Sequence, residues 1–208
     1  MSPAVPSGFR PVGEPEVVLA FLRGEIDSER FGAGVRAALA EVGGSRLVRH
    51  PDLDSDLENL ARERALATAR GWREGGMFEG FPERVDWYHG VLPPDVLARV
   101  RYIDYSYWNE LSGGSRRPAD VPATLRSGRL PQWVTELGTD WCFQLAALLA
   151  GAESVGDLIV MAAPGLERLV VLEGHARLTG VFVGGLEKRV TVRAYVGVSA
   201  AVDRWGCF

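Results

Sequence analysis

Five consecutive residues, Glu173-Gly174-His175-Ala176-Arg177, combine a carboxylate, a glycine, an imidazole and a guanidinium. They lie between two apolar segments, 169–172 and 178–182, of which the first favours a strand and the second a helix. The five residues would then form the N-terminus of that helix, where the first backbone N–H groups lack intrahelical partners and favour an anion. The sequence therefore predicts an anion-binding turn here.

Each side chain in this turn suits a role in phosphate chemistry. Gly174 lets a phosphate approach the backbone closely, and Arg177 can fork onto phosphate oxygens. Glu173 could act as a general base or as a ligand of Mg²⁺, and His175 could donate to phosphate or shuttle a proton. A purely structural alternative stays open, in which Glu173 is a helix-start acid, His175 a surface residue and Arg177 the i+4 ion-pair partner of Glu173.

A second polar loop could also bind a phosphate. Ser112-Gly113-Gly114-Ser115-Arg116 follows a segment, 100–108, whose alternation and aromatic content predict a strand. Successive backbone N–H groups in such a loop can surround one anion, although a solvated turn would have the same composition. The chain thus has two candidate phosphate-binding loops, each after a strand, and strand ends are where open α/β sheets usually bind ligands.

The elements around these loops predict a mixed α/β, or α+β, fold. After an irregular leader over 1–14, periodic apolar residues predict three helices, so that residues 1–95 form a mainly helical region. Residues 96–208 predict a small mixed sheet with packed helices. The expected helices are 15–24, 27–42, 55–72, 133–150 and 174–183, and the expected strands are 100–108, 157–161, 169–172 and 190–198.

One segment within the first 95 residues has two interpretations. Residues 75–90 mix Phe78, Phe81, Trp87, Tyr88 and His89 with glycines. Such an aromatic cluster fits core packing, and it also fits a lid or a substrate pocket over the site of the second region.

The stretch DLIVMAAPGLERLVVLEGHARLTGVF resembles the core of the ParB/sulfiredoxin-like superfamily, most clearly over 157–198 and less closely from about 96. The resemblance implies a nucleotide site in which Gly174 and Arg177 bind phosphate and Arg116 supplies the arginine of an earlier box. Partitioning proteins of this superfamily carry Gly-Glu-Arg-Arg where this chain has Gly174-His175-Ala176-Arg177, and sulfiredoxin needs a cysteine where this chain has His175. The acid-Gly-His box of free serine kinases is the nearest match. No helix-turn-helix is expected after the core.

These observations predict a nucleotide-dependent enzyme that acts on a small molecule, with phosphoryl transfer to a hydroxyl as the reaction and ATP or another nucleotide and Mg²⁺ as cofactors. Two alternatives are a nucleotide-binding regulator without turnover and a ParB-like nuclease or DNA-associated protein. The net charge of −4 and the lack of a basic tail predict no strong nucleic-acid binding. No signal peptide or membrane span is expected, and the two distant cysteines, Cys142 and Cys207, predict a reduced, cytoplasmic chain without a catalytic thiol pair.

Overall fold

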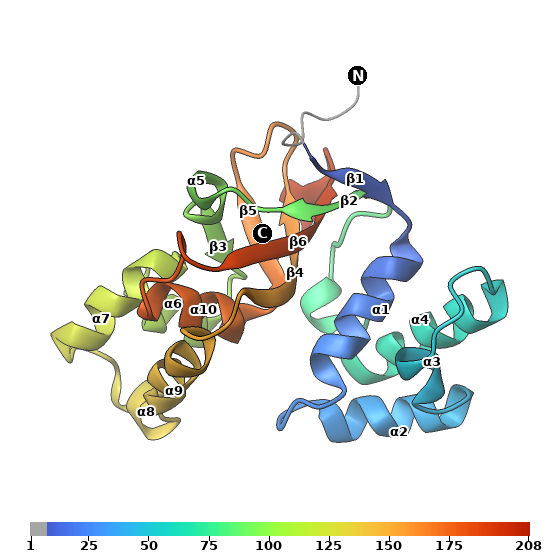
Figure 1. The fold of residues 1–208 in the computed structure, drawn as a ribbon, viewed down its shortest axis with the longest axis horizontal. Helices are drawn as coiled ribbons and strands as arrows, with labels where there is room; N and C mark the ends of the chain where they lie inside the picture. The colour runs from blue at the N-terminus through green and yellow to red at the C-terminus, as the bar shows by residue number, and fades with distance from the viewer. Residues whose placement is uncertain (1–7) are drawn as a thin grey trace.

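The computed structural model describes residues 8–208, which fold into an α+β structure around one mixed sheet (Figure 1). The strands are β1 (Arg10–Val12), β2 (Asp86–Val91), β3 (Val100–Tyr102), β4 (Ser154–Ala162), β5 (Leu169–Glu173) and β6 (Thr191–Val198). The helices are α1 (Glu14–Glu25), α2 (Gly32–Val42), α3 (Arg46–Arg49), α4 (Asp56–Arg70), α5 (Pro94–Leu97), α6 (Ser106–Leu111), α7 (Val121–Ser127), α8 (Gln132–Glu136), α9 (Asp140–Leu149) and α10 (His175–Val183).

The sheet has the strand order β1-β2-β6-β4-β5-β3. β6 and β4 are parallel, as are β5 and β3, whereas the pairs β1–β2, β2–β6 and β4–β5 are antiparallel. As a result, the carboxyl ends of β3 and β5 lie at the same end of the sheet as the amino ends of β4 and β6. This end of the sheet carries the predicted Glu173–Arg177 turn.

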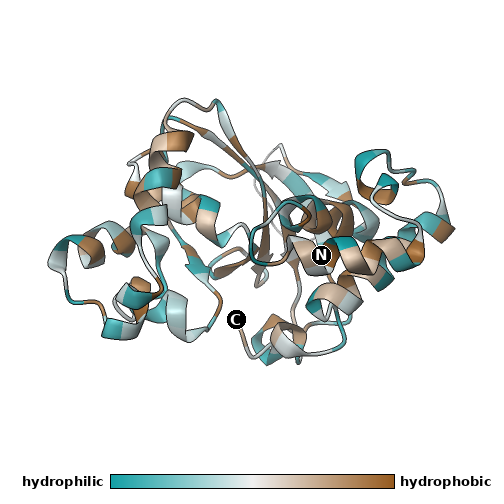
Figure 2. Cartoon of the chain, turned by 90° about the horizontal axis from the view of Figure 1, so that it is seen from below, coloured by the Kyte–Doolittle hydropathy of each residue, from teal (hydrophilic) through white to brown (hydrophobic). Residues whose placement is uncertain are grey.

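Both faces of the sheet are covered by helices, which explains why the buried runs 158–162 of β4 and 169–172 of β5 are apolar without interruption. In β4, Ile159 and Met161 pack into one core with α1–α4, while Leu158 and Val160 pack into a second core with α5, α6, α7, α9 and α10. Figure 2 shows hydrophobic residues concentrated in these central strands between the two groups of helices. The molecule therefore has three layers, with the helices of residues 14–70 on one side (Figure 1).

The sequence predicted most elements of the second half, with two corrections. The strand expected over 100–108 ends at Tyr102, because the backbone of Asp104 bonds to Cys207 instead of a neighbouring strand and Ser106–Leu111 forms α6. The helix expected over 133–150 is divided into α8 and α9, with Gly138 between them at a φ of +83°. In this left-handed conformation a glycine ends the helix readily.

The expectation of a helical region over 1–95 missed two strands. Residues 1–7 of the predicted leader lie outside the described residues, but Arg10–Val12 forms β1 and pairs with β2. β2 in turn pairs with β6, so the predicted boundary at residue 95 does not separate helices from the sheet.

The aromatic residues of 75–90 serve mainly as core. Phe78 packs on Phe21 and Trp72, and Phe81 packs on Trp72 and Trp205. The indole N–H of Trp205 donates to the Met77 carbonyl over 2.6 Å, which joins the C-terminal segment to this cluster.

Candidate functional site

The Glu173–Arg177 turn forms as the sequence predicted. Glu173 is the last residue of β5, Gly174 adopts a φ of +94°, and α10 begins at His175. A Cβ atom at Gly174 would collide with the side chain of Leu158 and contact the Arg177 guanidinium. Position 174 therefore requires glycine both for its left-handed backbone and for the side chains packed over it.

Glu173 and Arg177 form an i,i+4 ion pair, which is the contact that the structural alternative expected. Arg177 Nη2 also donates to the Asp157 carbonyl of β4 over 3.0 Å. The side chain of Arg177 is 27% exposed, while that of Glu173 is 10% exposed beneath it. Arg177 thus bridges two strands of the sheet and still presents part of its guanidinium to solvent.

Burial raises the pKa of Glu173 to about 7, well above its usual 4.5. The carboxylate of Glu25 adds to the rise, whereas the Arg177 guanidinium and the Gly174 backbone N–H lower this pKa. The effect of burial prevails because α1 seals the carboxylate: a Cβ atom at Gly24 would lie 2.8 Å from Glu173 Oε1. Glu173 therefore changes its protonation state near neutral pH.

A second buried ion pair lies behind Glu173 and joins α1 to α4. Arg70 Nε lies 3.5 Å from Glu25 Oε1, and the Arg70 guanidinium lies over the Phe31 ring, 3.5 Å from its centroid. Burial raises the pKa of Glu25 and lowers that of Arg70. Two carboxylates and two guanidiniums thus meet where the helices of the first core contact the end of β5.

His175 lies partly buried in an aromatic stack and not on the surface, where the structural alternative had placed it. Its ring stacks on Trp108 at 5.0 Å, and Trp108 stacks on Tyr102 at 4.8 Å. Burial, reinforced by the charges of Arg70 and Arg177, lowers the pKa of His175 to about 3. The imidazole is therefore neutral at neutral pH, and its buried Nε2 has no hydrogen-bond partner among residues 8–208.

A cavity of about 340 Å³ opens beside Arg177, between α1 and the amino ends of β4 and β6. Two cations, Arg23 and Arg177, line it. Its other polar walls are Glu16, which pairs with Arg10 at 2.8 Å, Asp157 and Tyr195. The remaining lining residues are Leu19, Ala20, Gly24, Leu53 and Gly156.

Asp157, at the edge of this cavity, has two cationic or polar neighbours of its own. His89 Nε2 lies 2.9 Å from Asp157 Oδ1, and Arg193 Nε lies 3.3 Å from the same oxygen. The His89 ring also stacks on Tyr195 with 4.4 Å between the centroids. Both acids of the cavity wall are thus partnered, and so is Arg177 through Glu173, whereas Arg23 makes no ion pair within residues 8–208.

The Ser112–Arg116 loop does not take part in this site. Its backbone N–H groups already have acceptors in α6 or in the loop itself, as in Gly114 to the Asn109 carbonyl at 2.7 Å and Arg116 to the Ser112 hydroxyl at 2.9 Å. Ser112 itself is buried, and Gly113 and Ser115 donate to the carbonyls of Glu110 and Ser112. The described loop therefore offers no free nest of amides to a phosphate.

Arg116 binds protein carbonyls. Its guanidinium donates to the carbonyls of Tyr102, Cys207 and Phe208 over 2.8–3.0 Å. It therefore fastens the C-terminal segment to the end of β3, and the cavity beside Arg177 includes no residue of the 112–116 loop.

A larger cavity of about 610 Å³ lies between α1, α4 and the segment that ends in Phe81 and Glu83. Glu14, Asp56, Glu63 and Glu83 line it, and its one arginine, Arg73, is bound to Glu14 by two contacts of 2.6 Å. None of the predicted phosphate-site residues lines this cavity, although Phe81 of the candidate substrate-pocket segment 75–90 does, and its negative lining disfavours an anion.

The residues around Glu173 do not fit a magnesium ion. Its carboxylate already faces the Arg177 guanidinium, so a second cation would have to displace an internal one. Among residues 8–208, no group of three or more His, Cys, Asp or Glu side chains has an arrangement that could hold a metal. The role of Glu173 as a Mg²⁺ ligand therefore stays a prediction without support from this geometry.

Sequence reasoning missed Arg23, Asp157, Tyr195 and Leu53. Arg23 lies in the helix expected over 15–24, which was predicted from its apolar residues alone, and Asp157 and Tyr195 were interpreted only as parts of strands. Nothing local in the sequence indicates that α1 lies over the amino ends of β4 and β6. The thiols are placed apart from the cavity: Cys142 is buried in α9, where its pKa is raised to about 12, and Cys207 is partly buried near the C-terminus.

Comparisons of the chain with known proteins found no match: no protein-family model, no curated protein and no solved structure is similar to it. The resemblance of 157–198 to the ParB/sulfiredoxin-like superfamily thus stays a prediction. Within residues 8–208, no helix combines the length and the apolar character that crossing a membrane requires.

Proposed function

We propose that the cavity beside Arg177 binds the phosphate group of a small molecule, and that the protein is an enzyme of phosphoryl transfer or hydrolysis with a nucleotide as the phosphate-bearing ligand. One observation carries this proposal: Arg177 is exposed on the cavity wall and is at the same time bonded to a buried carboxylate, Glu173, whose pKa is near 7. A strongly shifted group with a specific charge partner beside a cavity is a common feature of functional sites.

Arg23 and Arg177 are the residues that would hold the phosphate. They come from different elements, α1 and α10, and line the same cavity, so one anion could contact both. Guanidinium groups suit this role because their fixed donors match two phosphate oxygens at once.

Glu173 would be the group that moves a proton. Phosphate binding that draws Arg177 towards the cavity would uncover the Glu173 carboxylate, which does not itself line the cavity. Because its pKa is already near 7, Glu173 is suited to accept a proton from a hydroxyl or a water molecule. His175, being neutral and stacked, would support the wall of the site rather than shuttle protons.

A binding protein without turnover is the second candidate. The covering of Glu173 favours this candidate, because Gly24 of α1 and the Arg177 guanidinium lie against its carboxylate and separate it from the cavity. The two candidates differ in one measurable property, since only the enzyme releases phosphate or a phosphorylated product over time.

The proposal is tested by calorimetric titration with ATP, ADP and AMP, with and without Mg²⁺, beside a turnover assay. A charge-assisted contact contributes roughly 1.5–3 kcal/mol, so Arg177→Ala should weaken nucleotide binding by about tenfold to a hundredfold. Arg116→Ala is the matched control: it should lower the midpoint of unfolding, because three carbonyls lose a donor, and leave nucleotide affinity unchanged. Wild-type affinity in the Arg177 variant would remove the phosphate site from this cavity.

A further inference from the structure

The segment 50–55, between α3 and α4, contributes Leu53 to the cavity beside Arg177. Together with Leu19 and Ala20 of α1, Leu53 gives this cavity an apolar part beside the arginines. Leu53 is 38% exposed, so part of its side chain is open to a ligand. The two chemical parts of the lining fit a ligand that has both an anionic and an apolar group.

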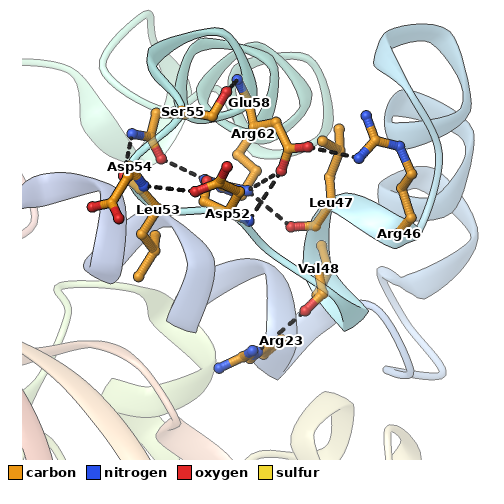
Figure 3. A network of polar contacts seen from close by, with 11 residues as sticks. Arg23, Arg46, Leu47, Val48, Asp52, Leu53, Asp54, Ser55, Glu58 and Arg62 are labelled. Carbon is orange, nitrogen blue, oxygen red and sulfur yellow. Dashed lines mark hydrogen bonds and ion pairs between the residues drawn. The ribbon is translucent and has the colours of Figure 1, made fainter.

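Leu53 is held in this position by polar contacts of its neighbours (Figure 3). Arg62, completely buried, donates to the carbonyls of Leu47 at 3.1 Å and Asp52 at 2.9 Å. The Asn59 side chain donates to the Leu53 carbonyl over 2.8 Å. The segment is therefore fixed from both sides of residue 53.

Further contacts close the same turn. The Asp52 backbone N–H donates to Glu58 Oε2 over 3.1 Å, and the Asp54 backbone N–H donates to Asp52 Oδ1 over 3.0 Å. Glu58 also bonds to the Ser55 hydroxyl through its own N–H, which caps α4 (Figure 3). Three residues of α4, Glu58, Asn59 and Arg62, thus hold one short loop whose apolar side chain, Leu53, stays partly exposed.

Arg23, one of the two cavity arginines, is tied to the same region. Its Nε donates to the Val48 carbonyl over 3.4 Å, one residue beyond the Leu47 carbonyl that Arg62 binds (Figure 3). The segment 46–55 therefore positions both an apolar and a cationic part of the wall.

We infer that Leu53 determines ligand specificity, and that the cavity takes an organic phosphate whose apolar group covers Leu53, Leu19 and Ala20 while its phosphate contacts Arg23 and Arg177. This inference rests on the proposed function and names its ligand class. The volume of about 340 Å³ lies near the lower end of the range of about 300–1,000 Å³ for small-molecule sites, which favours a small organic phosphate, such as a nucleoside monophosphate.

Two probes that share a phosphate group and differ in the presence of an apolar ring test this inference: inorganic phosphate and phenyl phosphate, each titrated into the full chain by calorimetry at a pH at which both are dianions. Wild-type protein should bind phenyl phosphate about tenfold or more tightly than inorganic phosphate, because the ring removes apolar surface from water. Leu53→Ala should weaken phenyl phosphate by about threefold to tenfold and change inorganic phosphate by less than about twofold. Arg177→Ala should weaken both probes.

Leu57→Ala is the matched control, since Leu57 is 82% exposed on the neighbouring turn of α4 and does not line the cavity. It should leave both affinities unchanged. Equal binding of the two probes to wild-type protein, or equal weakening of both by Leu53→Ala, would overturn the inference while leaving an Arg177-dependent phosphate site in place. If neither probe binds in a way that depends on Arg177, the proposed function fails as well.

Discussion

At the scale of single residues, Glu173 shows which of two opposing effects prevails in the site. Its ion pair with Arg177 favours the charged carboxylate, and burial beneath α1 favours the neutral acid. The pKa near 7 means that burial prevails. A rise from 4.5 to about 7 corresponds to roughly 3 kcal/mol of stability lost when the carboxyl is ionised. The folded protein therefore loses stability when Glu173 ionises, and Glu173 is the residue for which we propose a chemical role.

Glu173→Gln should change how stability depends on pH. Between pH 4.5 and about 7 the unfolded chain releases this proton while the folded protein keeps it, so the free energy of unfolding of the wild type falls as pH rises. The glutamine variant lacks this contribution. Its stability relative to the wild type should therefore improve by up to about 3 kcal/mol between pH 4.5 and 8, as measured by urea unfolding at several pH values.

The control for this measurement is Glu41→Gln, which changes an exposed glutamate of α2. Its difference from the wild type should stay constant over the same pH range. A constant difference for Glu173→Gln as well would mean that burial does not raise the pKa of Glu173.

The sequence predicted the position of Glu173, Gly174 and Arg177 at a strand-to-helix turn because the signal is local, an apolar run followed by a glycine. It did not predict the role of Arg116. An arginine after a glycine-rich loop suits a phosphate and a set of carbonyls equally well, and two of its three acceptors, in Cys207 and Phe208, lie about ninety residues along the chain. No local pattern contains that contact.

At the scale of elements, α10 is placed by its close contact with α9. A Cβ atom at Gly180 would lie 3.0 Å from Leu145 Cγ, 3.1 Å from Leu149 Cδ1 and 3.4 Å from the Ala146 backbone nitrogen. The absence of a side chain at position 180 therefore lets the two helices approach. Since α10 carries His175 and Arg177 at its first turn, this contact also sets the position of the site.

Two glycine-to-alanine changes distinguish the effect of helix propensity on stability from the effect of this close contact between α9 and α10. Alanine favours a helix over glycine by up to about 1 kcal/mol, and Gly34 of α2 has no atom within 4 Å of its added Cβ. Gly34→Ala should therefore raise the free energy of unfolding. Gly180→Ala should lower it by about 1 kcal/mol, because crowding in a packed interface costs about 1–3 kcal/mol. Equal effects of the two changes in urea unfolding would contradict the close contact.

The sequence predicted an element well where the pattern of its apolar residues and the length of the segment indicated the same element, as in the strands around 157–161 and 169–172. Elements were missed where contacts between residues far apart in the sequence determine the local structure. The segment 102–108 has the composition of a strand, yet it turns into α6 because Tyr102 and Trp108 stack and Asp104 bonds to Cys207. β2 was missed because Asp86–Val91 contains a glycine and alternates weakly, and its partner β6 lies about a hundred residues later.

At the scale of the whole molecule, one sheet supports two cores. The helices before β2 pack on one face, and those after it pack on the other. β4 and β5 contribute alternate residues to both cores, so neither core is complete without the shared sheet. This architecture predicts that residues 8–208 unfold as one cooperative unit, although the sequence had suggested a division at residue 95.

A buried thiol on one face can report a mutation on the other. Cys142 of α9 is completely buried in the second core, whereas Leu39 of α2 is completely buried in the first. In a Cys207→Ser background, Leu39→Ala should cost about 2–5 kcal/mol, and the denaturant midpoint of Cys142 labelling should fall as far as that of far-UV circular dichroism. Leu178→Ala, a change within the second core, should shift both probes in the same way. If Leu39→Ala shifted circular dichroism and left Cys142 protected, the two layers of helices would unfold separately, and the shared sheet would not couple them.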